Sequence, residues 1–312
     1  MRIAFFGTPP PAVPYLRAVD DAGHDVVAAV TQPDRPAGRG RTLQPSAVKV
    51  AAEEHGLPVM TPESAADDDF LRALSGKRPD LGVVVAYGQI LVRELLELPA
   101  LGFVNVHYSL LPELRGAAPV YGALRQGLDR TGVTVQFMAE ELDAGDIILQ
   151  REMSIEPEDN RETLTNRLTE VGVGLLLESM ELIEAGKAPR VEQDHSRATY
   201  VGRVSVEDCR IEWSADAGDV RNLVRACTPW PGAWCMLRDT RVKVQDVAVV
   251  QNVLTQEGRP GEIVEIPNSG GPVVLAGDHA VEIRRLQPAG RQPMSGEEFL
   301  RGARLEVGDC FD

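Results

Sequence analysis

The stretch LGFVNVHYSLLPELRGAAP, residues 101–119, decides the fold because it joins a buried strand to a polar turn. Its first part is largely apolar, and a second apolar run, DLGVVVAYG, covers residues 80–88. Continuous runs rich in β-branched residues are typical of parallel strands that are covered on both faces. Ligands of open α/β sheets bind at the carboxyl ends of such strands, and there this strand presents Asn105, His107 and Ser109. The sequence therefore predicts a functional site at this strand end.

Further strands and helices alternate around these two runs. We expect additional strands at residues 2–7, 25–32, 131–138 and 146–155. Helical spacing of apolar residues, together with capping and stop residues, predicts helices that begin near Ala12, Ser46 and Arg161. This alternation predicts a doubly wound, Rossmann-like α/β domain, which we place at residues 1–193.

The last third of the chain has a different pattern of polar and apolar residues. Polar residues of extended character come first, and we place an interdomain linker at residues 194–206. One helical segment, residues 217–227, is followed by short apolar runs that are separated by Gly and Pro turns. That spacing predicts a small, OB-like β-barrel domain at residues 207–312. We expect Trp230 and Trp234, in the segment PWPGAW, to pack in its core.

Composition and charge exclude several classes of protein. The chain has 312 residues, which is enough for two domains, and its formal net charge of −15 argues against a non-specific nucleic-acid binder. No apolar run reaches membrane-spanning length and the N-terminus lacks the features of a signal peptide, so we expect a cytoplasmic protein without a membrane partner. Because the cysteines form no CxxC pair, we expect free thiols, no disulfide framework and no metal site at the four positions Cys209, Cys227, Cys235 and Cys310.

One segment is basic within this acidic chain. The stretch PDRPAGRGRTLQPSAVK, residues 33–49, opposes one acid, Asp34, with four cations: Arg35, Arg39, Arg41 and Lys49. Such a segment is often only a solvated, mobile surface loop. Long structured loops between a strand and a helix also tend to be functional, and a local basic patch can bind a polyanion on an otherwise acidic protein.

The polar strand end suggests a reaction. Asn105 and His107 are two residues apart on the expected strand and so point to the same face, where an amide and an imidazole can stabilise an oxyanion. Asp143 lies in the turn LDAGD, from which its carboxylate can approach them. Because nothing marks Ser109 as an activated nucleophile, this set favours direct transfer to an amine over a covalent intermediate. The alternative is that Asn105 and His107 only satisfy backbone groups and that Asp143 is an ordinary turn residue.

A nicotinamide cofactor is disfavoured. The first strand runs into Gly7 followed by TPPP. A dinucleotide fingerprint needs further glycines there, so that the backbone can approach a pyrophosphate.

Several sequence blocks resemble the methionyl-tRNA formyltransferase family over essentially the whole chain. They are FFGTP (5–9), TQPDRPAGRGRTLQPSAVKVAAEEHGLPV (31–59), VVAYGQILVRELLELP (84–99), NVHYSLLPELRGAAP (105–119), LDAGDI (142–147), RIEWS (210–214) and RACTPWPGAW (225–234). Other formyl-folate enzymes share the blocks at 105–119 and 142–147. The basic segment and the C-terminal part make the resemblance specific.

The resemblance implies transfer of a formyl group from 10-formyltetrahydrofolate to the α-amino group of methionyl-initiator tRNA, without a metal and by a monomeric enzyme. It implies that Asn105, His107 and Asp143 are catalytic, with Asp143 orienting His107 and favouring its charged form. The implied folate-binding segment is Ser109, Leu110, Leu111 and Pro112. The implied tRNA contacts are Arg35, Arg39, Arg41, Lys49 and Arg203.

The chain departs from the family pattern at three places. Tyr108 stands where the family commonly has Gly, Pro10-Pro11 where it has Glu-Phe, and Arg203 where it has Lys. Two alternative functions remain at this point. One is a formyltransferase that acts on a sugar-nucleotide or ribonucleotide amine, which would not need the basic segment. The other is a folate- or RNA-binding protein without catalysis.

Overall fold

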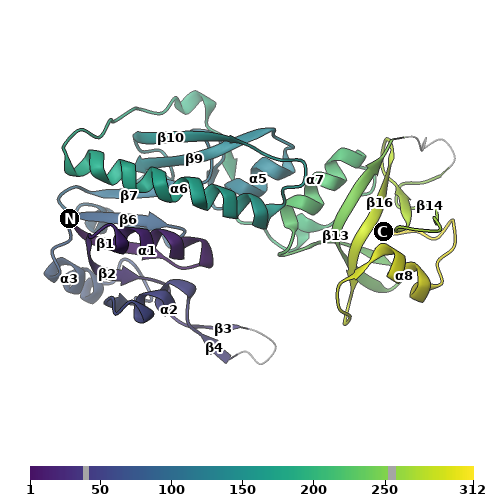
Figure 1. Ribbon diagram of the computed structural model, residues 1–312, viewed down its shortest axis with the longest axis horizontal. Coiled ribbons are helices and arrows are strands. Elements are labelled where there is room, and N and C mark those ends of the chain that lie inside the picture. The colour runs from purple at the N-terminus through teal and green to yellow at the C-terminus, as the bar shows by residue number, and fades with distance from the viewer. Residues whose placement is uncertain (38–41, 252–257) are drawn as a thin grey trace. The chain divides into compact units, whose positions relative to one another are not determined.

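The computed structural model describes residues 1–37, 42–251 and 258–312 (Figure 1). The chain forms two compact units, each made of three stretches of sequence. Unit 1 comprises Met1–Pro119, Arg130–Ser154 and Thr165–Val201. Unit 2 comprises Val120–Asp129, Ile155–Leu164 and Gly202–Asp312. Two short stretches before residue 193 thus belong to unit 2, whereas the sequence-based domain limits follow the chain in order and stay a prediction.

Unit 1 is built on a seven-stranded sheet with the order β10-β9-β7-β6-β1-β2-β5 (Figure 1). Its strands are β1 (Arg2–Gly7), β2 (Asp25–Val30), β5 (Val59–Met60), β6 (Leu81–Val85), β7 (Phe103–His107), β9 (Arg130–Phe137) and β10 (Ile147–Ser154). Strands β5, β2, β1, β6 and β7 are parallel, whereas β9 is antiparallel to β7 and β10 is antiparallel to β9. In the pairing of β7 with β9, Asn105 lies opposite Gln136 and His107 lies opposite Thr134.

Helices connect or follow these strands. They are η1 (Pro10–Ala12), α1 (Val13–Asp21), α2 (Ala47–Glu54), α3 (Asp68–Gly76), α4 (Arg93–Leu96), α6 (Arg161–Glu184, of which 161–164 belong to unit 2) and η2 (His195–Arg197). Ser46 caps α2 by accepting a hydrogen bond from the backbone of its first turn, as the sequence predicts. Helices α3 and α4 were not expected, although Asp67 caps α3 in the same way. They cover one face of the sheet, where Phe6 packs with Phe70 and Leu95.

Two small sheets complete unit 1. Strands β3 (Arg35–Ala37) and β4 (Thr42–Gln44) form an antiparallel pair within the basic segment. Strand β8 (Arg115–Gly116) pairs in parallel with β11 (Tyr200–Val201), which lies in the stretch expected to be a linker. These backbone hydrogen bonds tie the polar stretch around residue 200 to the turn that follows β7.

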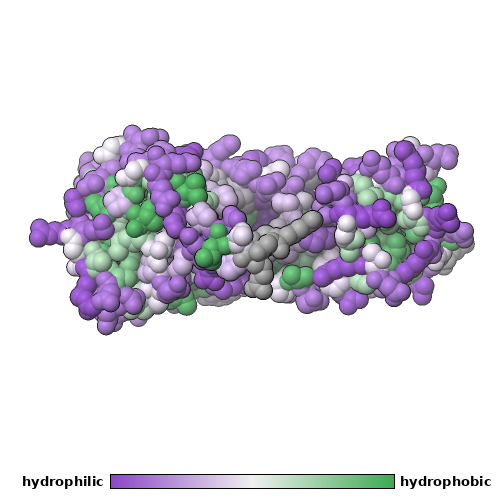
Figure 2. All heavy atoms as spheres, turned by 90° about the horizontal axis from the view of Figure 1, so that it is seen from below, coloured by the Kyte–Doolittle hydropathy of each residue, from purple (hydrophilic) through white to green (hydrophobic). Residues whose placement is uncertain are grey.

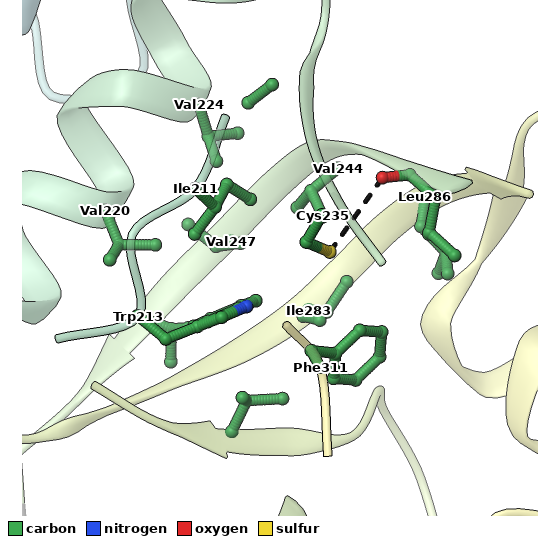
Figure 3. Packing of buried hydrophobic residues seen from close by; sticks show 14 of the residues in the cluster. Ile211, Trp213, Val220, Val224, Cys235, Val244, Val247, Ile283, Leu286 and Phe311 are labelled. Carbon is green, nitrogen blue, oxygen red and sulfur yellow. Dashed lines mark hydrogen bonds between the residues drawn. The ribbon is translucent and has the colours of Figure 1, made fainter. Parts of the chain in front are cut away.

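Unit 2 contains a six-stranded antiparallel sheet with the order β12-β13-β16-β15-β14, and β17 pairs with β16. Its strands are β12 (Ala233–Leu237), β13 (Thr240–Val250), β14 (Ile263–Glu265), β15 (Val273–Leu275), β16 (Ala280–Pro288) and β17 (Met294–Ser295). Its helices are α5 (Pro119–Arg125, of which Pro119 belongs to unit 1), η3 (Glu207–Cys209), α7 (Ala217–Cys227) and α8 (Gly296–Ala303). Figure 3 shows its core, which includes Trp213, Ile283 and Phe311. The predicted fold class, a doubly wound Rossmann-like domain followed by a small OB-like β domain, is confirmed.

The two tryptophans of the PWPGAW segment lie in different environments. Trp234 is buried as expected, and its indole nitrogen donates to the Val206 carbonyl at 2.8 Å. The expectation for Trp230 is wrong, because its side chain is 65 % exposed. Trp230 stands between two prolines in the turn after α7, and residues without a backbone N–H cannot extend the adjacent strand. The turn therefore stays at the surface.

The surface is mostly hydrophilic on the face shown in Figure 2, where hydrophobic residues form small separate patches. Large side chains that are more than half exposed include Ile90 on the loop after β6 and Leu142 on the turn after β9. All four cysteines are free thiols. Within the described ranges, no helix is long and apolar enough to cross a membrane.

Candidate active site

The three residues predicted to be catalytic come together at the carboxyl end of β7. Asn105 and His107 point to the same side of this strand, and the turn between β9 and β10 brings Asp143 to them. The Asn105 amide nitrogen donates to one Asp143 carboxylate oxygen at 3.4 Å. His107 Nδ1 lies 3.7 Å from the other oxygen. An amide, an imidazole and a carboxylate therefore share one small region.

The position of the hydrogen on His107 follows from its partners. His107 is 6 % exposed, and its Nε2 lies 2.9 Å from the carbonyl oxygen of Leu114. A carbonyl oxygen can only accept, so Nε2 must carry a hydrogen and donate it. Nδ1 then faces Asp143 at a distance typical of an ion pair but too long for a hydrogen bond. Nδ1 is thus the ring atom left available for proton transfer.

Asp143 is held from several sides. Its backbone has a φ of 51°, in the left-handed region, and its side chain is 11 % exposed. The Gly116 N–H donates to Oδ2 at 2.7 Å, and the Gln136 amide nitrogen donates to Oδ1 at 3.4 Å. Gly116 itself has a φ of 107°, and a Cβ there would lie 2.5 Å from the Val201 carbonyl oxygen. Only glycine fits this point, where the turn after β7 meets both β11 and Asp143.

Three site residues were missed in the sequence. Arg115 is fully buried, Gln136 lies opposite Asn105 in the sheet, and Gln193 is 4 % exposed. A single amide in the apolar strand TGVTVQFM was a usable signal for Gln136. Gln193 had no such signal, because it stands among other polar residues directly before the expected linker.

The predicted folate segment forms a packed turn. Ser109, Leu111 and Pro112 are buried, whereas Leu110 is half-buried. Ser109 Oγ donates to the Glu113 carbonyl at 2.5 Å. The side chains of Gln150 and Thr134 bond to the backbone of the same turn. Leu110 is therefore the member of this segment whose side chain is best placed to meet a ligand.

Tyr108, which replaces the family's glycine, points toward α6. Its hydroxyl is 2.8 Å from Thr169 Oγ1, and burial raises the pKa of the Tyr108 phenol. Tyr15 of α1 lies beside it and is also buried. The substitution thus fills space between α1 and α6 and leaves the side of β7 that carries Asn105 and His107 unchanged.

The structure describes three of the five residues predicted to contact tRNA. Arg35 is exposed on β3, and Arg203 is exposed in unit 2. Arg39 and Arg41 lie outside the described residues. Lys49 Nζ is 2.9 Å from both carboxylate oxygens of Asp34, and this hydrogen-bonded pair raises the pKa of Lys49. Lys49 is therefore charged and partly neutralised by its neighbour.

A separate cavity of about 550 Å³ opens in unit 1 near the start of β7. Phe103, Phe137 and Met138 give it apolar walls, and Glu97 and Arg190 add charge. Neither the candidate catalytic residues nor the predicted folate segment line it. In the described part of the chain, no group of three or more His, Cys, Asp or Glu side chains is arranged to hold a metal ion.

Comparison with protein families and curated proteins covers the full chain. The model of the formyl transferase family matches residues 1–180, and that of the formyl transferase C-terminal domain matches residues 203–304. Methionyl-tRNA formyltransferase of Moorella thermoacetica is 44% identical over 311 residues, which cover 100% of this chain and 99% of the relative. Methionyl-tRNA formyltransferase of Bacillus cytotoxicus is 42% identical over 308 residues, which cover 99% of this chain and 98% of the relative.

Solved structures share the fold at low identity. The N-formyltransferase from Helicobacter canadensis in complex with folinic acid and dTDP-3-aminofucose has a TM-score of 0.67 at 16% identity, covering 91% of this chain and 98% of that one. HypX from Aquifex aeolicus in complex with tetrahydrofolic acid has a TM-score of 0.64 at 19% identity, covering 100% of this chain and 50% of that one. At these identities the likeness concerns the fold alone.

Proposed function

Since this chain belongs to the methionyl-tRNA formyltransferase family, we propose that it transfers the formyl group of 10-formyltetrahydrofolate to the α-amino group of methionyl-initiator tRNA. The product, N-formylmethionyl-tRNA, serves translation initiation. The observation that carries the proposal is the meeting of Asn105, His107 and Asp143 in a chain whose full length matches these relatives. A monomeric state and a cytoplasmic location are part of the same proposal.

The proposed reaction forms a bond between the amine nitrogen and the formyl carbon and breaks the bond from that carbon to the folate nitrogen. The Asn105 amide donates a hydrogen bond to the oxyanion that develops on the formyl oxygen, and the protonated Nδ1 of His107 adds a second donor. The amine loses a proton and the departing folate nitrogen gains one. His107 Nδ1, 3.7 Å from Asp143, can give its proton to the departing folate nitrogen and then take up the proton that the amine loses, directly or through a water molecule.

A flat folate donor needs apolar contacts, and exposed apolar side chains stand on loops that follow two strands of the sheet. Ile90 is 85 % exposed and Leu142 is 59 % exposed, on loops that follow β6 and β9. Exposed apolar side chains beside polar groups are what a ring system would cover on binding. Leu110 adds a third partly exposed apolar contact, while Ser109, Leu111 and Pro112 hold the turn that presents it.

The tRNA is proposed to bind through local cations. A net charge of −15 repels nucleic acid over most of the surface. The basic segment around the β3–β4 pair concentrates positive charge, with Arg35 exposed and Lys49 paired to Asp34. Arg39, Arg41 and Arg203 complete the proposed set. A sugar-nucleotide acceptor is less favoured, because relatives at 40–44% identity over the whole chain are methionyl-tRNA formyltransferases.

The test is formyl transfer from 10-formyltetrahydrofolate to charged initiator tRNA, to uncharged initiator tRNA and to free methionine. We expect turnover with the charged tRNA alone. Hydrolysis of the folate without an acylated product would show that the site is active but that the acceptor is a different amine. Transfer to free methionine at the same efficiency would contradict a role for the tRNA body.

A further inference from the structure

Arg115 is a buried cation that the proposed reaction does not use. Its side chain is 1 % exposed, and its ion-pair partner in the described ranges, Glu141 at 3.4 Å, is 66 % exposed. Burying a charge is costly unless polar groups compensate for the lost water. The side chains of three further residues contact the guanidinium, namely Gln193, His195 and Tyr200. The contact with Gln193 is double, with Nε and a terminal nitrogen of Arg115 at 3.2 and 2.7 Å from the same amide oxygen.

A continuous hydrogen-bond chain leads from this cation to Asp143. The Gln193 amide nitrogen donates to the Gln136 amide oxygen at 3.1 Å. The Gln136 amide nitrogen in turn donates to Asp143 Oδ1 at 3.4 Å. The chain of groups is therefore guanidinium, amide, amide and carboxylate, and it joins residues from the turn after β7, from β9 and from the stretch that follows α6.

The direction of this chain follows from chemistry. A guanidinium can only donate hydrogen bonds and an ionised carboxylate can only accept them. Each amide between them must therefore turn its oxygen toward Arg115 and its nitrogen toward Asp143. In such a chain every bond polarises the next one in the same sense, which strengthens the set in a buried environment.

Gln193 also fixes the backbone that carries Asp143. Its amide nitrogen lies 2.9 Å from the Asp143 carbonyl oxygen and 2.7 Å from that of Gly145. Asp143 has a backbone φ of 51°, which is uncommon for a non-glycine residue although Asp adopts it more often than most, and the bonds from Gln193 hold the turn in that conformation. One side chain thus connects the buried charge to both the main chain and the carboxylate of this turn.

We propose that Arg115, Gln193 and Gln136 are positioning residues that hold the Asp143 carboxylate in the orientation His107 needs for formyl transfer. This inference rests on the proposed function. The three residues touch no reacting atom and act through Asp143. Their loss lowers kcat and leaves the KM values for folate and tRNA unchanged. Residues that orient a reactive group in this way typically change activity by about 10- to 100-fold.

Two substitutions of Gln136 test this hydrogen-bond chain from Arg115 to Asp143, called the relay below, without removing the buried charge of Arg115. Gln136→Leu deletes the last link, whereas Gln193 keeps its bonds to the carbonyls of Asp143 and Gly145. Gln136→Glu keeps an oxygen for Gln193 but places an acceptor against Asp143 Oδ1. We expect kcat to fall in the order wild type, Leu variant, Glu variant. A purely structural role predicts no such dependence on the polarity of the side chain.

Thr131→Val is the matched control. Thr131 lies on the same strand, and its buried hydroxyl has no hydrogen-bond partner among the described residues. This variant should keep the wild-type kcat and thermal midpoint. Arg115→Lys should restore part of the activity that Arg115→Met loses, because a lysine keeps the charge but not the double contact. If the Arg115 variants do not fold, the two Gln136 variants decide alone.

The measurement is steady-state formyl transfer to charged initiator tRNA, with folate affinity and thermal midpoint determined for each variant. A lowered kcat at constant KM, graded from Leu to Glu at position 136, supports the relay. A wild-type kcat in both Gln136 variants, or a change confined to KM, would overturn it. Absence of formyl transfer by the wild-type protein would instead contradict the proposed function, so the two failures are distinguishable.

Discussion

His107 donates from Nε2 to the carbonyl oxygen of Leu114, 2.9 Å away, and so turns Nδ1 toward the reacting side of the site. Leu114 can offer this carbonyl because its backbone adopts a φ of 58° in the turn after β7. The Leu114 N–H is held in turn by Thr199 Oγ1 at 2.8 Å. The orientation of the imidazole therefore depends on a strained turn that a distant part of the chain supports.

Asp143→Asn should lower kcat by on the order of 10²- to 10⁴-fold. An amide in place of the carboxylate has one acceptor oxygen for the Gly116 N–H and for the donors from Asn105 and Gln136. The substitution would also remove the negative charge that faces His107 Nδ1. Steady-state kinetics with charged initiator tRNA measure the effect. Asp146→Asn in the same turn is the control, since Asp146 pairs with the exposed Arg190 and should keep near wild-type activity.

Gly116→Ala should lower both stability and activity. A side chain at a φ of 107° is strained, and its Cβ would meet the Val201 carbonyl oxygen. We expect a loss of about 1–3 kcal/mol in the free energy of unfolding, measured by denaturant titration. Gly174→Ala in α6 has open space and should instead stabilise by about 0.5–1 kcal/mol. Equal behaviour of the two variants would contradict the close approach described for Gly116.

Substituting arginines of the basic segment should weaken the binding of tRNA alone. Arg39→Ala with Arg41→Ala is expected to raise the KM for charged tRNA and to leave folate binding unchanged. Each lost phosphate contact should also make the affinity less dependent on salt. The slope of log affinity against log salt concentration should become shallower by about 0.7–0.9 per contact. Asp34→Asn tests the opposite direction, because it releases Lys49 from its partner and should lower the KM for tRNA. Unchanged tRNA kinetics in both variants would remove this segment from the interface.

A contact at the N-terminus of α7 should make the stability of unit 2 depend on pH. Asp278 accepts a hydrogen bond from the Ala217 N–H at 2.7 Å, and this bond lowers the pKa of Asp278. A carboxyl group with a lowered pKa in the folded state contributes stability above its unfolded pKa of about 3.9. That contribution disappears as the pH falls through the folded value.

Asp278→Ala should therefore cost about 0.5–2 kcal/mol at pH 7, the range for a lost helix cap. The difference from wild type should shrink when unfolding is measured in acid, well below the folded pKa. Asp216→Ala is the comparison, because Asp216 occupies the N-cap position without making a side-chain cap hydrogen bond. A difference between Asp278→Ala and wild type that is the same at both pH values would contradict the assignment.

The main strands and the placement of Asn105 and His107 on one face could be predicted because their pattern is local. A few consecutive residues are enough to indicate that Leu81–Val85 is a buried strand and that Phe103–His107 ends in polar side chains. Two-residue spacing alone places Asn105 and His107 on one face. A capped amphipathic segment such as α3 was also visible in principle, through Asp67 and the acidic first turn.

The supporting residues could not be predicted, because their roles arise from contacts between distant parts of the sequence. Gln193 meets Arg115 across 78 positions of the chain. A polar side chain in a polar stretch gives no local sign that it will be buried, and an arginine before Gly116 resembles any surface cation. Trp230 shows the reverse case, in which a large apolar residue stays exposed because flanking prolines keep it out of a strand.

The most direct test of the account is the single-turnover rate of formyl transfer to charged initiator tRNA by the wild-type protein and by His107→Ala, with folate affinity measured in parallel. We expect a rate lower by on the order of 10²- to 10⁴-fold in the variant and an unchanged affinity for the folate donor. An unchanged single-turnover rate would remove His107 from the chemistry and with it the proposed role of the Asn105, His107 and Asp143 set.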